Sequence, residues 1–277
     1  MLKTRVITAL LLLAVMLPIL YFNHFPAFVF VNVLFFTAAI WECARVFGVV
    51  GNRALACAFA AMALLILTVV KGGGANIGFL FTLCVGLWCL CFIPSLAFGL
   101  PPLKNIGNGI VGLTYAISIF GCFLAILGLF LHSPLYLFSV MTIVWTADIG
   151  AYFCGKAFGT RKLAPSISPG KSWEGVIGGW LLVLMITSII CVTPAAIPLS
   201  DTFPVQLFNV LGWPGLFGVM TVLVIASVIG DLFESLLKRR AGIKDSSQLL
   251  PGHGGVLDRI DALIPVLPLV ALLGFWF

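Results

Sequence analysis

One stretch near the C-terminal end of the sequence gathers side chains that can bind phosphates and a metal ion. It runs from Ser235 to Asp261 and reads SLLKRRAGIKDSSQLLPGHGGVLDRID, with five cations, three carboxylates and one histidine. Lysine and arginine neutralise phosphates, glycines such as Gly254 and Gly255 allow close backbone approach to a ligand, and clustered aspartate oxygens suit Mg²⁺. The pattern favours a site for a phosphorylated ligand over the alternative, a solvated basic loop.

Acidic residues inside apolar segments extend this candidate site. Asp148 lies in the run MTIVWTADIGAYFCGKAFG, where an ionised carboxylate costs at least about 2.5 kcal/mol unless it is paired, metal-bound or hydrated. Asp231 and Glu234 are spaced i,i+3, and Ser235 and Lys238 fall on the same face of a helix. This spacing predicts a polar stripe, although an ion pair between Glu234 and Lys238 would also explain part of it.

A second glycine-rich and basic loop spans residues 155–175. Its Gly-Lys-Ser sequence at Lys171 resembles the end of a P-loop, but that motif requires glycine where this chain has Pro165. We therefore reject the P-loop and expect Ser172 to cap the following helix, with Glu174 in its first turn. Lys171 would then lie at a helix N-terminus, where anions bind readily.

The elements that position these residues must be membrane helices. The chain of 277 residues is 62% hydrophobic and only 9% charged, whereas soluble domains carry about 25% charged residues. The fold class predicted is all-α, a polytopic membrane protein with about nine transmembrane helices. The nine apolar segments are residues 6–22, 25–41, 54–70, 77–98, 109–131, 135–154, 176–193, 214–237 and 262–277.

The cations indicate the orientation. With nine spans, every lysine and arginine except Lys71 lies on one side of the membrane, and short cytoplasmic loops are enriched in these residues. We expect a cytoplasmic N-terminus and a site facing the cytoplasm. Because the net charge of +6 is spread over short loops, anionic lipids and a phosphorylated cosubstrate are favoured as partners over nucleic acid.

The chemistry is unevenly distributed along the chain. Residues 1–132 form the predicted N-terminal membrane scaffold, and residues 133–277 the catalytic region with loops 155–175 and 238–261, in one integrated membrane domain. In the scaffold, Trp41, Glu42 and Arg45 are interpreted as a membrane-interface anchor and an i,i+3 ion pair. Contact between Glu42 and the active site is the alternative.

The C-terminal half resembles the phosphatidate cytidylyltransferase family. The matching positions in the dense stretch are Ser235, Lys238, Arg239, Lys244, Asp245, Ser247, Leu250, Pro251, His253, Gly254, Gly255, Val256, Asp258, Arg259, Ile260 and Asp261. Upstream, Asp148, Ala151-Tyr152, Gly155-Lys156, Gly159, Ser168-Pro169, Lys171-Ser172 and Glu174-Gly175 are also similar to that family.

The resemblance implies a reaction and roles for individual residues. CTP and phosphatidate would give CDP-diacylglycerol and pyrophosphate, in a homodimer of a bacterial plasma membrane, with Mg²⁺ and possibly a second metal ion. Asp231 and Asp258 would be the main metal ligands, Glu234 and Asp261 further ligands, and Asp148 a catalytic neighbour along with Lys171. The residues expected at phosphates are Lys171, Ser172, Ser235, Lys238, Arg239, Lys244, His253, Gly254, Gly255 and Arg259. His253 is expected to organise the loop or contact phosphate rather than accept a proton.

Three alternatives stay open at this point. A secondary transporter would explain acids beside Gly and Pro breaks, but the first half has no matching polar set. A non-catalytic membrane assembly factor would explain the spans and not the loop. An enzyme that uses CTP with an isoprenoid or sugar lipid would retain the nucleotide site and change the lipid pocket.

Overall fold

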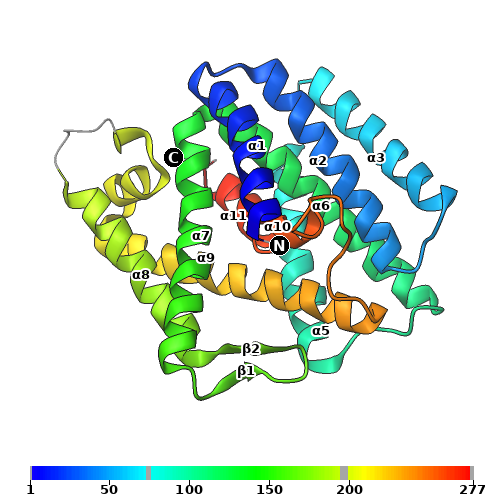
Figure 1. Ribbon diagram of the computed structural model, residues 1–277. Coiled ribbons are helices and arrows are strands. Elements are labelled where there is room, and N and C mark those ends of the chain that lie inside the picture. The colour runs from blue at the N-terminus through cyan, green and yellow to red at the C-terminus, as the bar shows by residue number, and fades with distance from the viewer. Residues whose placement is uncertain (1, 73–75, 194–198, 275–277) are drawn as a thin grey trace.

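The computed structural model describes residues 2–72, 76–193 and 199–274, and it is almost entirely helical (Figure 1). The elements of the first half are α1 (Leu2–Tyr21), α2 (Phe25–Val46), α3 (Asn52–Val70), α4 (Ile77–Leu87), the π-helical turn η1 (Trp88–Phe92), α5 (Ile93–Phe98) and α6 (Ile106–His132). Those of the second half are α7 (Pro134–Phe158), β1 (Lys162–Ala164), β2 (Ser168–Ser172), α8 (Trp173–Val192), η2 (Leu199–Asp201), α9 (Phe203–Ala241), α10 (Leu257–Ile260) and α11 (Leu263–Leu273).

Seven helices in the described part of the chain are long and apolar enough to cross a membrane. They correspond to seven of the nine predicted spans. The predicted class, an all-α membrane protein, is therefore supported, apart from the exact number of spans. The first and last predicted spans correspond to shorter described apolar helices, Leu10–Tyr21 and Leu263–Leu273. Because the last predicted span extends to Phe277, its end lies outside the described residues, and the count of nine stays a prediction.

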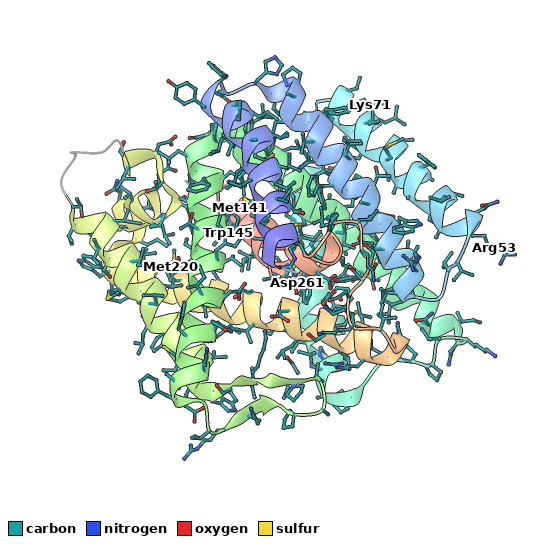
Figure 2. The ribbon with its side chains drawn as sticks, viewed as in Figure 1. Arg53, Lys71, Met141, Trp145, Met220 and Asp261 are labelled. Atoms are coloured by element: carbon teal, nitrogen blue, oxygen red, sulfur yellow. The ribbon has the colours of Figure 1, made fainter. Side chains whose placement is uncertain are left out.

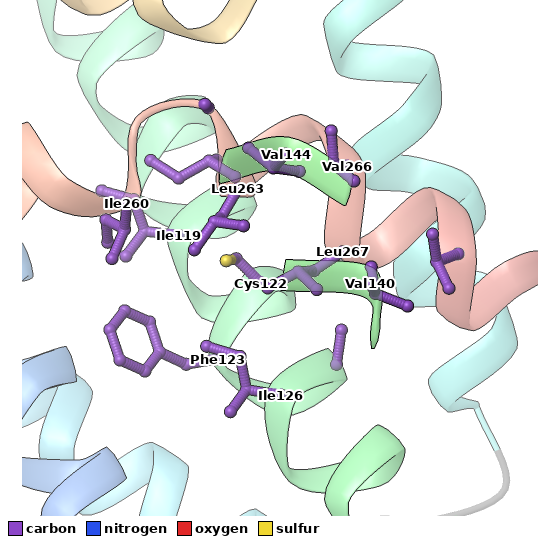
Figure 3. Close-up of a cluster of buried hydrophobic side chains, with 14 of the residues drawn as sticks. Ile119, Cys122, Phe123, Ile126, Val140, Val144, Ile260, Leu263, Val266 and Leu267 are labelled. Atoms are coloured by element: carbon purple, nitrogen blue, oxygen red, sulfur yellow. The ribbon is translucent and has the colours of Figure 1, made fainter. Parts of the chain in front are cut away.

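The short helix α11 lies in the middle of the bundle. It packs against α4, α6, α7 and α9, and Figure 1 shows it among the longer helices α6, α7 and α9. Figure 3 shows the apolar contact: Ile119 and Cys122 of α6 and Val140 of α7 face Leu263 and Leu267. All five side chains are buried, so α11 and the preceding α10 are held in place by apolar packing from several sides.

Helices α7 and α8 pack with their backbones almost in contact. A Cβ atom added to Gly179 of α8 would overlap the carbonyl oxygen of Ala147 in α7, and one added to Gly150 would lie 2.9 Å from the Cα of Gly179. Small residues allow such close approach between membrane helices. The pair lies side by side in Figure 1 and ends at the two-stranded hairpin, whose position it therefore fixes.

The hairpin is a local departure from the all-α prediction. Strands β1 and β2 pair antiparallel within the segment that the sequence predicted as a loop. The Glu174 carboxylate accepts hydrogen bonds from the amides of Thr160 and Arg161 and from the Thr160 hydroxyl, which ties the start of β1 to the start of α8. Strands this short, with Pro169 and Gly170 inside β2, carry no alternating pattern by which they could be predicted.

Helix α9 is broken near its start. Gly212 has a φ of 63° and a ψ of −167°, outside the helical region, and Pro214 follows two residues later. Glycine adopts positive φ without a steric penalty, and proline is tolerated in the first turn of a helix. The break coincides with the predicted start of the eighth span at Pro214.

Adding one methyl group at the α7–α8 contact should destabilise the protein. Gly179→Ala would place a Cβ against backbone atoms that cannot move independently, so we expect the free energy of unfolding to fall by about 1–3 kcal/mol. The matched control is Gly109→Ala in α6, where the added Cβ meets no atom within 4 Å. Thermal unfolding in detergent compares the two. Equal midpoints would contradict the close packing described here.

Candidate active site

Lys171 and Asp231 form the first of two ion-paired groups. Lys171 lies in β2 and Asp231 in the C-terminal third of α9, and their Nζ and Oδ2 atoms are 2.5 Å apart. The Ser235 hydroxyl donates to Oδ1 of Asp231 over 3.3 Å. Side-chain exposures of 24% for Lys171 and 30% for Asp231 leave this pair accessible to a ligand.

Lys238 links the second group. Its ammonium contacts the carboxylate of Glu234, one turn earlier in α9, and lies 2.7 Å from Oδ1 of Asp258. The Glu234 and Asp258 side chains are 1% and 4% exposed. The Glu234–Lys238 ion pair considered from the sequence is confirmed, and the structure adds Asp258 from the following loop as a second partner of the same lysine.

Asp258 is held by its own loop. Its Oδ2 accepts hydrogen bonds from the Ser246 amide at 2.9 Å, the Ser246 hydroxyl at 3.0 Å and the Gly255 amide at 2.8 Å. Burial alone would raise the pKa of Asp258, but the ammonium of Lys238 and the hydrogen bond from the Gly255 amide lower it to about 2. The neighbouring Gly254 has a φ of 84°, a conformation that favours glycine. The loop therefore stabilises an ionised carboxylate.

Asp148 and Asp261 complete the cluster. Asp148, exposed on α7, interacts electrostatically with Asp231 and Lys171. Asp261, which Figure 2 shows near the centre of the view beside α9, interacts with Asp231, Lys171 and Lys238. Burial, and then the negative charge of Asp231, raise the pKa of Asp261 above its ordinary value. The structure thus brings together the predicted acids from α7, α9 and the segment after the loop.

The chemistry of this cluster fits a divalent cation, although the described residues do not form a finished cage. Five carboxylates share two ammonium groups, and carboxylate oxygens are the ligands that Mg²⁺ prefers. Yet no three acidic, histidine or cysteine side chains in the described part of the chain are arranged to hold a metal ion. Three of these carboxylates, those of Asp231, Glu234 and Asp258, instead contact Lys171 or Lys238.

The remaining predicted residues lie around the cluster in different settings. Ser172 caps α8 as predicted, since its hydroxyl accepts from the Gly175 amide at 3.2 Å. Arg239 is exposed and donates to the Ile167 carbonyl of the hairpin. Lys244 and Arg259 are exposed, and no ion pair joins either to the cluster within the described residues.

His253 organises the loop through its backbone. Its amide donates to the Leu250 carbonyl at 2.8 Å, while its buried ring atom Nδ1 has no hydrogen-bond partner in the structure. Any residue other than proline could make this backbone contact, so the role expected of the His253 side chain stays a prediction.

For Glu42 the preferred interpretation from the sequence, an ion pair with Arg45, is wrong, and the structure agrees with the alternative, contact with the candidate site. Glu42 does not pair with Arg45, whose guanidinium instead lies 4.5 Å from the centre of the Trp41 ring. The Glu42 side chain is fully buried and accepts four hydrogen bonds from residues 246–257. An i,i+3 spacing cannot distinguish an ion pair on the helix surface from two side chains that point in different directions. The only feature of the sequence that could have indicated burial of Glu42 is its position at the end of an apolar span.

Fold and site together define a helical membrane protein with a cluster of lysines and carboxylates at the C-terminal part of its longest helix, α9. Comparison with known protein families matches the chain, over residues 3–277, to the cytidylyltransferase family. The chain belongs to this family, and the resemblance found in the sequence is confirmed.

Several curated relatives carry the name phosphatidate cytidylyltransferase. The protein from Haemophilus influenzae is 49% identical over 146 residues, covering 52% of this chain and 47% of that protein. The Pseudomonas aeruginosa protein is 50% identical over 135 residues, covering 49% and 45%, respectively. One from Staphylococcus aureus is 45% identical over 143 residues, covering 52% and 49%. The chain spans about half the length of the curated relatives it matches.

Removing the ammonium of Lys238 should destabilise the fold itself. Lys238→Met keeps most of the side-chain volume but leaves Glu234 and Asp258 buried without their shared cation, which should cost about 3–5 kcal/mol of the free energy of unfolding. Lys104→Met, at an exposed loop position, should change it by less than about 0.5 kcal/mol. Unfolding of the two purified variants measures the difference. An unaltered Lys238→Met protein would show that the ion pairs are not needed.

Proposed function

We propose that this protein is a phosphatidate cytidylyltransferase that converts CTP and phosphatidate into CDP-diacylglycerol and pyrophosphate. Family membership and the names of the relatives support the proposal. The observation that carries it is the cluster in which Lys171 and Lys238 neutralise carboxylates from α9 and its following loop. Such a cluster can exchange its internal ion pairs for contacts with phosphates and a cation.

In the proposed reaction, a phosphate oxygen of phosphatidate attacks the α-phosphorus of CTP. A new P–O bond forms to the lipid phosphate, the bond from the α-phosphorus to the bridging oxygen breaks, and pyrophosphate leaves with that electron pair. The attacking oxygen is already anionic, so no strong general base is required. The barrier is lowered mainly by neutralising charge and aligning the two phosphates.

Each charged residue has a part in this proposal. Lys171, in the more exposed pair, would move from Asp231 to a substrate phosphate, and Lys238 would act similarly from the buried side. Asp231 and Asp258, with Glu234 and Asp261 as further ligands and Asp148 beside them, would hold Mg²⁺, possibly with a second ion. A bound divalent cation supplies neutralisation of the triphosphate charge. Outer phosphate contacts are proposed for Ser172, Ser235, Arg239, Lys244, His253, Gly254, Gly255 and Arg259.

We further propose that the protein lies in a bacterial plasma membrane as a homodimer, with the cluster facing the cytoplasm. Arg53 and Lys71 lie at opposite ends of α3 (Figure 2), which is consistent with the predicted isolation of Lys71 from the other cations. In this proposal residues 133–277 form the catalytic region and residues 1–132 the membrane scaffold, within one integrated membrane domain.

The activity can be tested with purified protein in detergent. Radiolabelled CTP, Mg²⁺ and phosphatidate should yield a lipid-soluble cytidine product, together with pyrophosphate. Parallel reactions with an isoprenoid phosphate or a sugar-phosphate lipid test the related enzyme class. Transfer of label only to one of those acceptors would replace phosphatidate as the substrate, and no transfer to any lipid would overturn the proposed activity.

Two isosteric substitutions test the metal assignment. Asp231→Asn and Asp258→Asn each remove one charge with little change in volume, so we expect turnover with Mg²⁺ to fall by at least about 100-fold in a folded protein. Asp201→Asn is the control, because Asp201 hydrogen-bonds Gln206 rather than the cluster. The same labelled-CTP assay applies. Normal turnover in both Asp231→Asn and Asp258→Asn would remove these residues as ligands.

A further inference from the structure

Glu42 occupies an unusual position for an acid in the scaffold half. It lies in the last turns of α2, its side chain is fully buried, and its carboxylate is fully hydrogen-bonded. Oε1 accepts from the Ser247 hydroxyl at 2.5 Å and the Val256 amide at 3.0 Å. Oε2 accepts from the Ser246 hydroxyl at 3.1 Å and the Leu257 amide at 2.7 Å. Each oxygen therefore receives one hydroxyl and one backbone amide.

These four donors replace the cation that a buried carboxylate normally requires. No lysine, arginine or histidine in the described residues forms an ion pair with Glu42. Val256 and Leu257 lie at the start of α10, which has no side-chain cap of its own, so Glu42 satisfies two amides that would otherwise lack partners. The interaction holds two parts of the loop 238–261, Ser246-Ser247 and Val256-Leu257, against α2.

The same loop atoms hold Asp258. The Ser246 hydroxyl lies between Oε2 of Glu42, at 3.1 Å, and Oδ2 of Asp258, at 3.0 Å, so its single hydrogen is shared between the two carboxylates. Gly255 donates its amide to Asp258, and a Cβ added there would overlap the Ser246 hydroxyl and lie 2.6 Å from Oε1 of Glu42. Two carboxylates from distant parts of the chain thus bind the same turn, and no space is left for a side chain at Gly255.

We propose that Glu42 is a positioning residue for the cytidylyl-transfer site, acting through Ser246 and the Val256-Leu257 amides to fix the carboxylate of Asp258. This inference rests on the proposed function and deepens it. Glu42 touches neither reacting phosphate nor metal in this account. It determines whether Asp258 is already oriented when CTP and the cation bind, and it gives the N-terminal half a direct part in the catalytic geometry.

The first test is Glu42→Gln, which keeps the shape and removes one acceptor. The new NH₂ group would face the Val256 or the Leu257 amide, leaving that amide without a partner. We expect kcat to fall about 10- to 100-fold and the Mg²⁺ concentration for half-maximal activity to rise at least about fivefold, as for other groups that orient metal ligands. Hydrogen exchange of residues 246–260, measured without substrate or metal, should also accelerate. Asp201→Asn should leave all three readouts unchanged.

A pair of serine variants separates positioning from general stabilisation. Ser246→Ala and Ser247→Ala each remove one hydroxyl bond to Glu42, but only Ser246 also contacts Asp258. We expect Ser246→Ala to raise the Mg²⁺ requirement at least about threefold more than Ser247→Ala. Equal effects of the two serine variants would overturn the proposal. So would a folded Glu42→Gln protein with wild-type kcat and Mg²⁺ dependence, and if that variant does not fold, the serine pair decides.

The experiments distinguish failure of the proposed activity from failure of the positioning role of Glu42. If the wild-type protein transfers no cytidylyl group, the activity is wrong, whereas the hydrogen-exchange comparison still reports whether Glu42 orders the loop. If the wild-type protein is active and exchange in residues 246–260 is the same with and without the Glu42 carboxylate, the positioning role alone is wrong.

Discussion

The sharing of two lysine ammonium groups among several carboxylates is the interaction on which the rest of this structure depends. Negative charge in a poorly hydrated region is unstable unless it is neutralised, and Lys238 serves Glu234 and Asp258 at once while Lys171 serves Asp231. Carboxyl groups outnumber ammonium groups in the cluster, and this excess is the basis for the proposal that a cation binds there.

The packing of the helices brings the lysine and carboxylate side chains of the cluster to one place. Close α7–α8 packing positions the hairpin that carries Lys171, the regular helix after the break at Gly212 presents Asp231, Glu234 and Lys238, and the buried α11 fixes the chain just after Asp261. The N-terminal half contributes more than support. Glu42 of α2 binds the loop, and the Thr8 hydroxyl of α1 donates to the Pro251 carbonyl at 2.8 Å.

Local features of the site could be predicted from the sequence, whereas contacts between distant segments could not. Helical spacing placed Asp231, Glu234 and Lys238 on one face, and the Ser172 cap follows from four consecutive residues. Ser246 and Glu42 are 204 positions apart, and nothing in the local pattern of Trp41-Glu42 indicates that the carboxylate turns inward. The β-hairpin was missed because its strands are too short for a periodic signal. The metal-ligand assignments stay predictions, because the lysines now occupy the oxygens in question.

The central claim is that these carboxylates exchange their lysine partners for a divalent cation when the nucleotide binds. The most direct measurement is a diffraction experiment on crystals grown with CTP and Mn²⁺, using the anomalous signal of manganese to locate the ion. The account predicts an anomalous peak within about 2.5 Å of carboxylate oxygens of both Asp231 and Asp258, with Lys171 moved onto phosphate. A peak bound by CTP phosphates alone, with the Lys171–Asp231 and Lys238–Asp258 ion pairs intact, would contradict it.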